Sequence, residues 1–125
     1  MIRHHLKSAD AQGLSAVRSS SIAVVNGTAH MTVIPPLPIR HDQTAAEQAA
    51  AIFQEIERRL ESVGSSKSRI AHITIWLSHL MYFQEVTEVW NEWVDPANPP
   101  VRACAQVNLA NKNLKVEMIV VADAS

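Results

Sequence analysis

Two strand-like runs in the last third of the chain each enclose a charged residue among apolar and β-branched neighbours. The first run, residues 99–107, contains Arg102, and the second, residues 114–121, contains Glu117. Short apolar runs bounded by turn-forming residues predict buried strands. A charge in such surroundings is costly unless it is paired or faces a cavity. Arg102 and Glu117 therefore need an explanation, either as a structural ion pair or as parts of a site.

The composition predicts one ordinary globular domain covering residues 1–125. The net charge of −1 gives no electrostatic reason to expect a nucleic acid or an acidic membrane as a partner. A single cysteine excludes an internal disulfide framework and fits a reducing compartment. No apolar run is long enough to span a membrane and no secretory signal is visible, so we expect a cytoplasmic protein.

The first third of the chain predicts strands. Residues 2–6 are compatible with a short edge strand, and residues 9–19 are expected to be irregular. Residues 20–25 and 28–34 are β-prone and are separated by Asn26-Gly27, the pair favoured in a two-residue type I′ turn.

The middle of the chain alternates between helical and strand periodicity. Thr44 and Glu47 form a capping-box pattern that opens a helix closed by Gly64. In residues 69–80 the apolar residues recur with a period of two, which predicts a strand. Residues 81–94 return to a helical period. The residues expected on the inner side of the strand are Ala71, Ile73, Ile75 and Leu77.

The predicted order is therefore β-β-α-β-α-β-β, which is typical of an α+β sandwich with two helices on one face of a mixed sheet. The face of the sheet opposite the helices must also be shielded from water. Its expected residues are small and apolar (Ala23, Val25, Ala103 and Ala105), which suggests burial against a neighbouring subunit.

The segments around Arg102 and around Glu117 resemble the late signature of the Rid family, also called the YjgF/YER057c/UK114 family. That signature has a proline, a small residue and an arginine before a strand that often contains cysteine, followed by a strand with a Val/Ile-Glu-Ile/Met pattern. Residues 69–77 resemble the family's central strand, and the resemblance extends over about residues 20–121. The Ser65-Ser66-Lys67-Ser68 segment is similar to the short, YoaB-like branch of the family.

The resemblance implies a chorismate-mutase-like fold that assembles as a homotrimer with a site in each cleft between subunits. It also implies hydrolysis of reactive enamines and imines, such as 2-aminoacrylate, to 2-keto acids and ammonia, without a cofactor. In this scheme Arg102 binds the substrate carboxylate and Glu117 orients or activates water. A guanidinium suits the first role because it binds a carboxylate through two parallel hydrogen bonds.

Three further residues are expected to line the substrate-binding site. Cys104 alternates with Arg102 along one strand, Ser20 lies where the family has a serine after an arginine, and Val33 lies late in the second strand. Cys104 is also compatible with a small buried residue. If the last two strands form a hairpin around residues 109–113, Arg102 and Glu117 lie at similar levels, and register decides whether they share a face. The six histidines show no metal-ligand spacing, so no metal is expected.

Two departures from the family pattern keep a second function open. Residues 18–21 replace a tyrosine near the first strand, and residues 31–35 lack the glycine found late in the second. The alternative function is a trimeric module that binds small carboxylates such as 2-keto acids without turnover. A ribonuclease activity, ascribed to some family members, is disfavoured by the near-neutral charge and by the absence of a basic aromatic patch.

Overall fold

The computed structural model describes residues 1–6 and 17–125, so residues 9–16 of the segment expected to be irregular lie outside the described residues. Its main elements follow the predicted order with the N-terminal strand added. They are β1 (Ile2–Leu6), β2 (Ser20–Val25), β3 (Thr28–Val33), α2 (Ala45–Ser62), β4 (Ile70–Leu77), α3 (Phe83–Trp93), β5 (Val101–Gln106) and β6 (Val116–Asp123).

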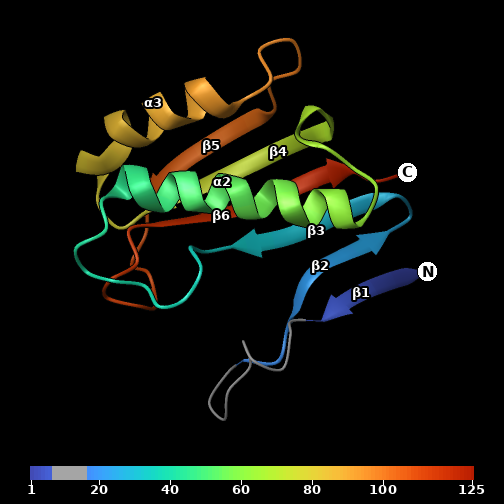
Figure 1. Ribbon diagram of the computed structural model, residues 1–125, viewed down its shortest axis with the longest axis horizontal. Helices are drawn as coiled ribbons and strands as arrows, with labels where there is room; N and C mark the ends of the chain where they lie inside the picture. The colour runs from blue at the N-terminus through green and yellow to red at the C-terminus, as the bar shows by residue number, and fades with distance from the viewer. Residues whose placement is uncertain (7–16) are drawn as a thin grey trace.

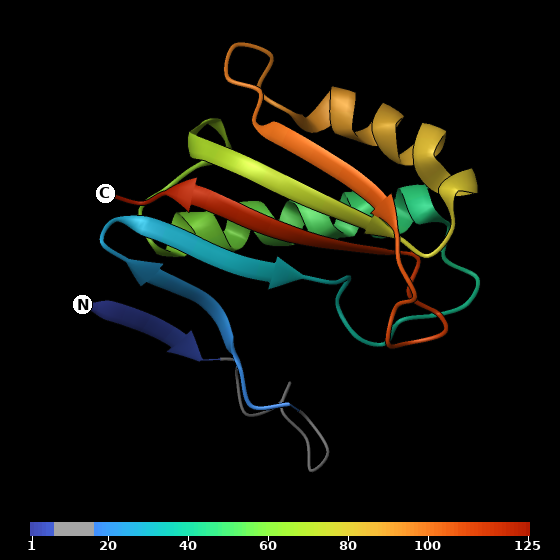
Figure 2. The same ribbon diagram turned by 180° about the vertical axis from the view of Figure 1, so that it is seen from behind.

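The strands form a six-stranded mixed sheet in the order β1-β2-β3-β6-β4-β5. Among the strands of the described residues only β4 and β5 pair in parallel, because the segment that contains α3 returns the chain to the end of the sheet where β4 begins. Both helices lie on one side of the sheet, with α3 toward the β5 edge (Figure 1). Figure 2, from behind, shows the opposite side of the strands. We call these sides the helix-proximal face and the helix-distal face. The expected α+β sandwich is confirmed.

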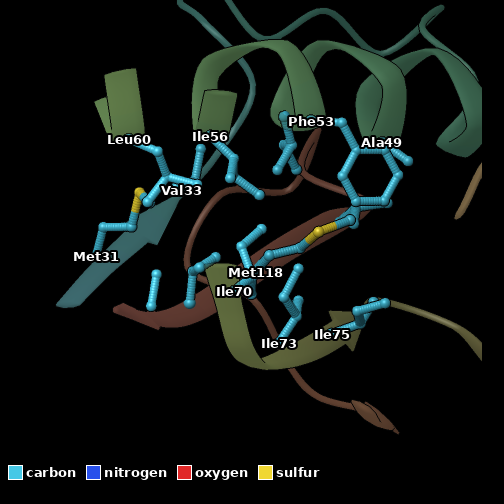
Figure 3. Close-up of a cluster of buried hydrophobic side chains, with 14 of the residues drawn as sticks. Met31, Val33, Ala49, Phe53, Ile56, Leu60, Ile70, Ile73, Ile75 and Met118 are labelled. Carbon is cyan, nitrogen blue, oxygen red and sulfur yellow. The ribbon is translucent and has the colours of Figure 1, made fainter. Parts of the chain in front are cut away.

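The hydrophobic core fills the space between α2 and the helix-proximal face (Figure 3). The apolar stripe of α2 points into this space, and alternate residues of the central strands meet it. The ring of Phe53 stacks on Trp93 of α3 at a centroid distance of 4.1 Å, which joins the two helices. The large side chains that are fully buried include Phe53, Ile52, Ile56, Leu60, Ile73, Ile75, Leu77 and Met118.

Local signals in the sequence place the ends of several elements correctly. Asn26 and Gly27 both have positive φ, as a type I′ turn requires, and they join β2 to β3. Thr44 and Glu47 form both hydrogen bonds of the capping box at the start of α2. Gly64 has a φ of +77° just after the end of α2, where the left-handed conformation favours glycine.

Two predictions about strands need correction. Ala71 is exposed instead of pointing inward, because an irregularity between Ile70 and His72 shifts the register and brings Ile70 to the core side. The hairpin considered for the last two strands does not form, since β4 lies between β5 and β6. β5 instead pairs in parallel with β4 and forms the edge of the sheet.

Gln48 on α2 is a buried polar residue that fixes the entry into β6. Its side chain is fully buried, donates to the carbonyl of Asn113 at 2.9 Å and accepts from the backbone N–H groups of Lys115 at 2.8 Å and Val116 at 3.3 Å. Leaving a buried backbone group without a hydrogen-bond partner costs more free energy than forming that hydrogen bond contributes to stability. The amide therefore ties the register of β6 to the position of α2.

We expect Gln48→Met to lower the free energy of unfolding by about 3 kcal/mol, because a side chain of similar length leaves these backbone groups unsatisfied. Urea unfolding followed by circular dichroism measures this change. The matched control is Gln54→Met on the exposed side of the same helix, with an expected change below about 0.5 kcal/mol. Equal effects of the two substitutions would contradict this role for Gln48.

Candidate functional site

Arg102 lies on β5 on the helix-proximal face, beneath α3. Its register partner is Ile73, whose side chain is fully buried, so Arg102 points to the same side. The guanidinium lies over the rings of Phe83 and Trp90, with its carbon 5.4 Å and 5.1 Å from their centroids. One of its nitrogens donates to the hydroxyl of Thr87 at 2.8 Å. Three residues of α3 therefore hold the half-buried cation in place.

No carboxylate of the described residues forms an ion pair with Arg102. A guanidinium has five N–H donors in a planar fork, and the hydrogen bond to Thr87 uses one of its nitrogens. Stacking on aromatic rings fixes the plane of the fork without using its hydrogen-bonding edge. The arrangement is suited to binding a planar anion such as a carboxylate.

Glu117 lies on β6 on the helix-distal face. Its register partner is Trp76, and the flanking residues Val116 and Met118 are fully buried on the other side. Burial raises the pKa of the Glu117 carboxyl above its ordinary value. Among the described residues no cation forms an ion pair with it. Glu117 is thus a partly desolvated carboxyl group on this face.

Arg102 and Glu117 therefore lie on opposite faces of one sheet, separated by β4. The interpretation of the two residues as an ion pair with each other is wrong for the single chain. The sequence left their relative face open, and the strand order decides it, because Arg102 follows Ile73 to one side whereas Glu117 follows Trp76 to the other. A site that uses both side chains cannot form on one face of one chain.

The other expected site residues also divide between the faces. Cys104 is a free thiol that is half-buried on the helix-proximal face and packs against the core two residues after Arg102. Val33 is fully buried in the core, so it offers no surface to a substrate.

Ser20 lies at the start of β2, where the pairing with β1 is irregular. Its hydroxyl is 3.4 Å from Nδ1 of His4. His4 pairs with Ala23, whose neighbours Ile22 and Val24 point into the core, so His4 lies on the helix-distal face. Ser20 therefore lies on the helix-distal face, as Glu117 does. It is far from β5, because three strands lie between β2 and β5.

Sequence reasoning missed Thr87 and the aromatic support of Arg102. The helical period of residues 81–94 predicts Phe83 and Trp90 on one packing stripe, which is correct for Trp90, whereas Phe83 is 44% exposed. The sequence signal that could have predicted this support is an arginine on a strand that follows a helix rich in aromatic residues. No group of three or more residues able to hold a metal ion occurs within residues 1–6 and 17–125.

Comparisons with known proteins place the chain in a family. Residues 9–124 match the model of the family described as Endoribonuclease L-PSP. The chain belongs to this family, which includes the Rid or YjgF proteins. The RutC family protein YoaB of Escherichia coli is 35% identical over 105 residues, covering 84% of this chain and 90% of the relative. A RutC family protein of Haemophilus ducreyi is 34% identical over 105 residues, covering 84% of this chain and 88% of the relative.

Solved structures agree with this assignment. The crystal structure of a YjgF family member from Neisseria meningitidis aligns with a TM-score of 0.83 and 27% identity over 98% of this chain and 94% of that one. The fold and the family resemblance inferred from the sequence, including the likeness to YoaB, are therefore confirmed. In the part of this Rid chain that the structure describes, no helix is long and apolar enough to cross a membrane.

The raised pKa of Glu117 predicts the sign of a pH effect on stability. Because the neutral carboxyl is favoured in the folded chain, its contribution to stability is present below the ordinary pKa of 4.5 and is lost as the pH rises through the folded pKa. Glu117→Gln should therefore melt at a higher temperature than the wild type at pH 7.5, with no difference near pH 4. Calorimetry at both pH values tests this.

The matched control for this experiment is Glu92→Gln on α3, which removes the same charge from an exposed position. A Glu117→Gln protein that is less stable than the wild type at pH 7.5 would show that Glu117 has a stabilising partner.

Proposed function

We propose that this Rid-family protein hydrolyses carboxylate-bearing imines and enamines, of the 2-aminoacrylate type, to 2-keto acids and ammonia. The single observation that carries the proposal is the state of Arg102. It is a half-buried guanidinium held by two aromatic rings and a hydroxyl, with no carboxylate of the described residues bound to it. Such a group is pre-organised to bind the carboxylate of a small substrate through two hydrogen bonds.

The reaction follows from the chemistry of the two charged groups. The enamine first takes a proton from water at its terminal carbon and becomes the iminium ion. Glu117 accepts a proton from a second water as its oxygen adds to the iminium carbon, and the electron pair of the C=N bond moves to nitrogen, which gives a neutral carbinolamine. Protonated Glu117 then returns this proton to the amino group, and the carbinolamine hydroxyl loses its proton to hydroxide as its C=O bond forms and ammonia leaves. A carboxyl whose pKa is raised by burial is better matched to proton transfer at neutral pH.

The site is proposed to form between subunits of a homotrimer. Arg102 and Glu117 lie on opposite faces of one sheet, so two chains are needed to bring the side chains together. The helix-distal face supports this assembly because it carries exposed or half-exposed large apolar residues on β6 and β5. These residues are Ile119, Val121 and Val101. Cys104 is free, which fits the expected cytoplasmic location.

We expect Arg102→Ala to lower kcat/KM for 2-aminoacrylate hydrolysis by about 100-fold, because two charge-assisted hydrogen bonds to the substrate are lost. A dehydratase generates the substrate in situ, and the release of ammonia and keto acid above the spontaneous rate is measured. The control is Arg40→Ala, which removes an exposed arginine in the segment before α2. If the wild type does not accelerate release, deamination is excluded.

The binding module remains the second candidate, supported by the lack of the family's tyrosine at residues 18–21. Titration of 2-keto acids by calorimetry separates the two functions. Saturable binding that requires Arg102, without acceleration of hydrolysis, would establish carboxylate binding alone. The description of the family as an endoribonuclease makes RNA cleavage a further outcome to exclude. The net charge of −1 provides little attraction for a polyanion.

A subunit-mixing experiment tests the shared site. Arg102→Ala and Glu117→Gln chains should each have little activity alone, about one hundredth of that of the wild type. When they are refolded together in equal amounts, about one quarter of the clefts between subunits should contain both an intact arginine and an intact glutamate. We therefore expect about a quarter of the wild-type activity to return. Two variants that keep this low activity after mixing would contradict a site built from two chains.

A further inference from the structure

Trp76 differs from the other two tryptophans of the chain. Trp90 and Trp93 pack around Phe53 in the core, and Nε1 of Trp93 donates to Glu57 at 3.0 Å. Trp76 is half-buried on the helix-distal face, where no aromatic ring or hydrogen-bond acceptor of the described residues partners its indole. A large side chain at this position therefore has no explanation in the packing of the single chain.

The neighbours of Trp76 across the sheet are unequal in size. Glu117 is its partner on β6 and Ala105 is its partner on β5. Directly opposite residues of an antiparallel pair have Cβ atoms about 4.5–5.5 Å apart, so the indole and the carboxylate lie side by side. On the other side Ala103 and Ala105 are exposed and present methyl groups only. The indole is thus a large apolar surface next to Glu117, and it projects beyond the small side chains of Ala103 and Ala105.

We propose that Trp76 determines the substrate specificity of the site to which Glu117 contributes. The indole forms the apolar wall against which the side chain of the imino acid lies, and the alanines of β5 leave room for that side chain. The substrate class it selects is imino acids with a branched or aromatic apolar side chain, in preference to the smallest one. This inference rests on the proposed function, because it places Trp76 beside the group that activates water.

The physical basis is the removal of apolar surface from water. A tryptophan ring offers a large, rigid area at little cost in conformational entropy, and its N–H remains free to bond with water or substrate. Each added methylene of a substrate in an apolar pocket contributes about tenfold or more to discrimination. Removing the indole should therefore lower kcat/KM for large substrates by more than it does for the smallest one.

The test compares imines that an amino-acid oxidase releases from alanine, leucine and phenylalanine. We expect the wild type to hydrolyse the leucine and phenylalanine imines with a kcat/KM about tenfold or more above that of the alanine imine. Trp76→Ala should abolish this preference mainly through KM, whereas Trp76→Phe should retain most of it. The readout is the ratio of kcat/KM between the substrates, measured within each variant. A general loss of assembly or folding lowers all rates together and leaves this ratio unchanged.

Calorimetric titration with the corresponding 2-keto acids separates this inference from the proposed function. A preference for the larger keto acids that Trp76→Ala removes supports the role of Trp76 even if no imine is hydrolysed. Hydrolysis with the same substrate ratios in the wild type and in Trp76→Ala overturns the role of Trp76 and leaves the proposed function intact. The absence of both binding and hydrolysis overturns both.

Discussion

The position of β4 between β5 and β6 is the constraint on which the arrangement of this chain depends. Its two ladders, parallel on one side and antiparallel on the other, fix the register of both neighbours. Because side chains alternate along each strand, that register decides which residues point to the core and which point away. Ile73, Ile75 and Leu77 fill the core. Arg102 and Cys104 follow these residues to the helix-proximal face, and Glu117 follows Trp76 to the helix-distal face.

The two faces create different environments for the two charges. Arg102 lies half-buried under α3, where two aromatic rings and a hydroxyl hold its guanidinium. Glu117 lies near the start of β6 opposite Trp76, and the partial loss of hydration disfavours its ionised form. One charge is therefore suited to binding an anion and the other to accepting a proton. Their separation makes a second chain part of the proposed chemistry.

The sequence predicted most of the elements because each carried its own local signal. The Asn26-Gly27 turn, the Thr44–Glu47 capping box and Gly64 depend on the φ values and hydrogen bonds of a few adjacent residues, and all three formed as expected. Ala71 shows the limit of such reasoning. The alternation in β4 predicted that Ala71 points into the core. One irregularity in the ladder with β6 places Ile70 there instead and leaves Ala71 exposed. No local sequence pattern indicates an irregularity of this kind.

The sequence by itself determined the fold class, the two helices on one face, the family, and the unusual presence of Arg102 and Glu117 in strands. These follow from hydrophobic period, turn chemistry and motif, which reside in short stretches of chain. Only the tertiary structure decided that β4 separates β5 from β6, that Val33 is a core residue, and that Thr87, Phe83 and Trp90 support Arg102. Strand order and register arise from contacts between residues far apart in the chain, and no single stretch encodes them.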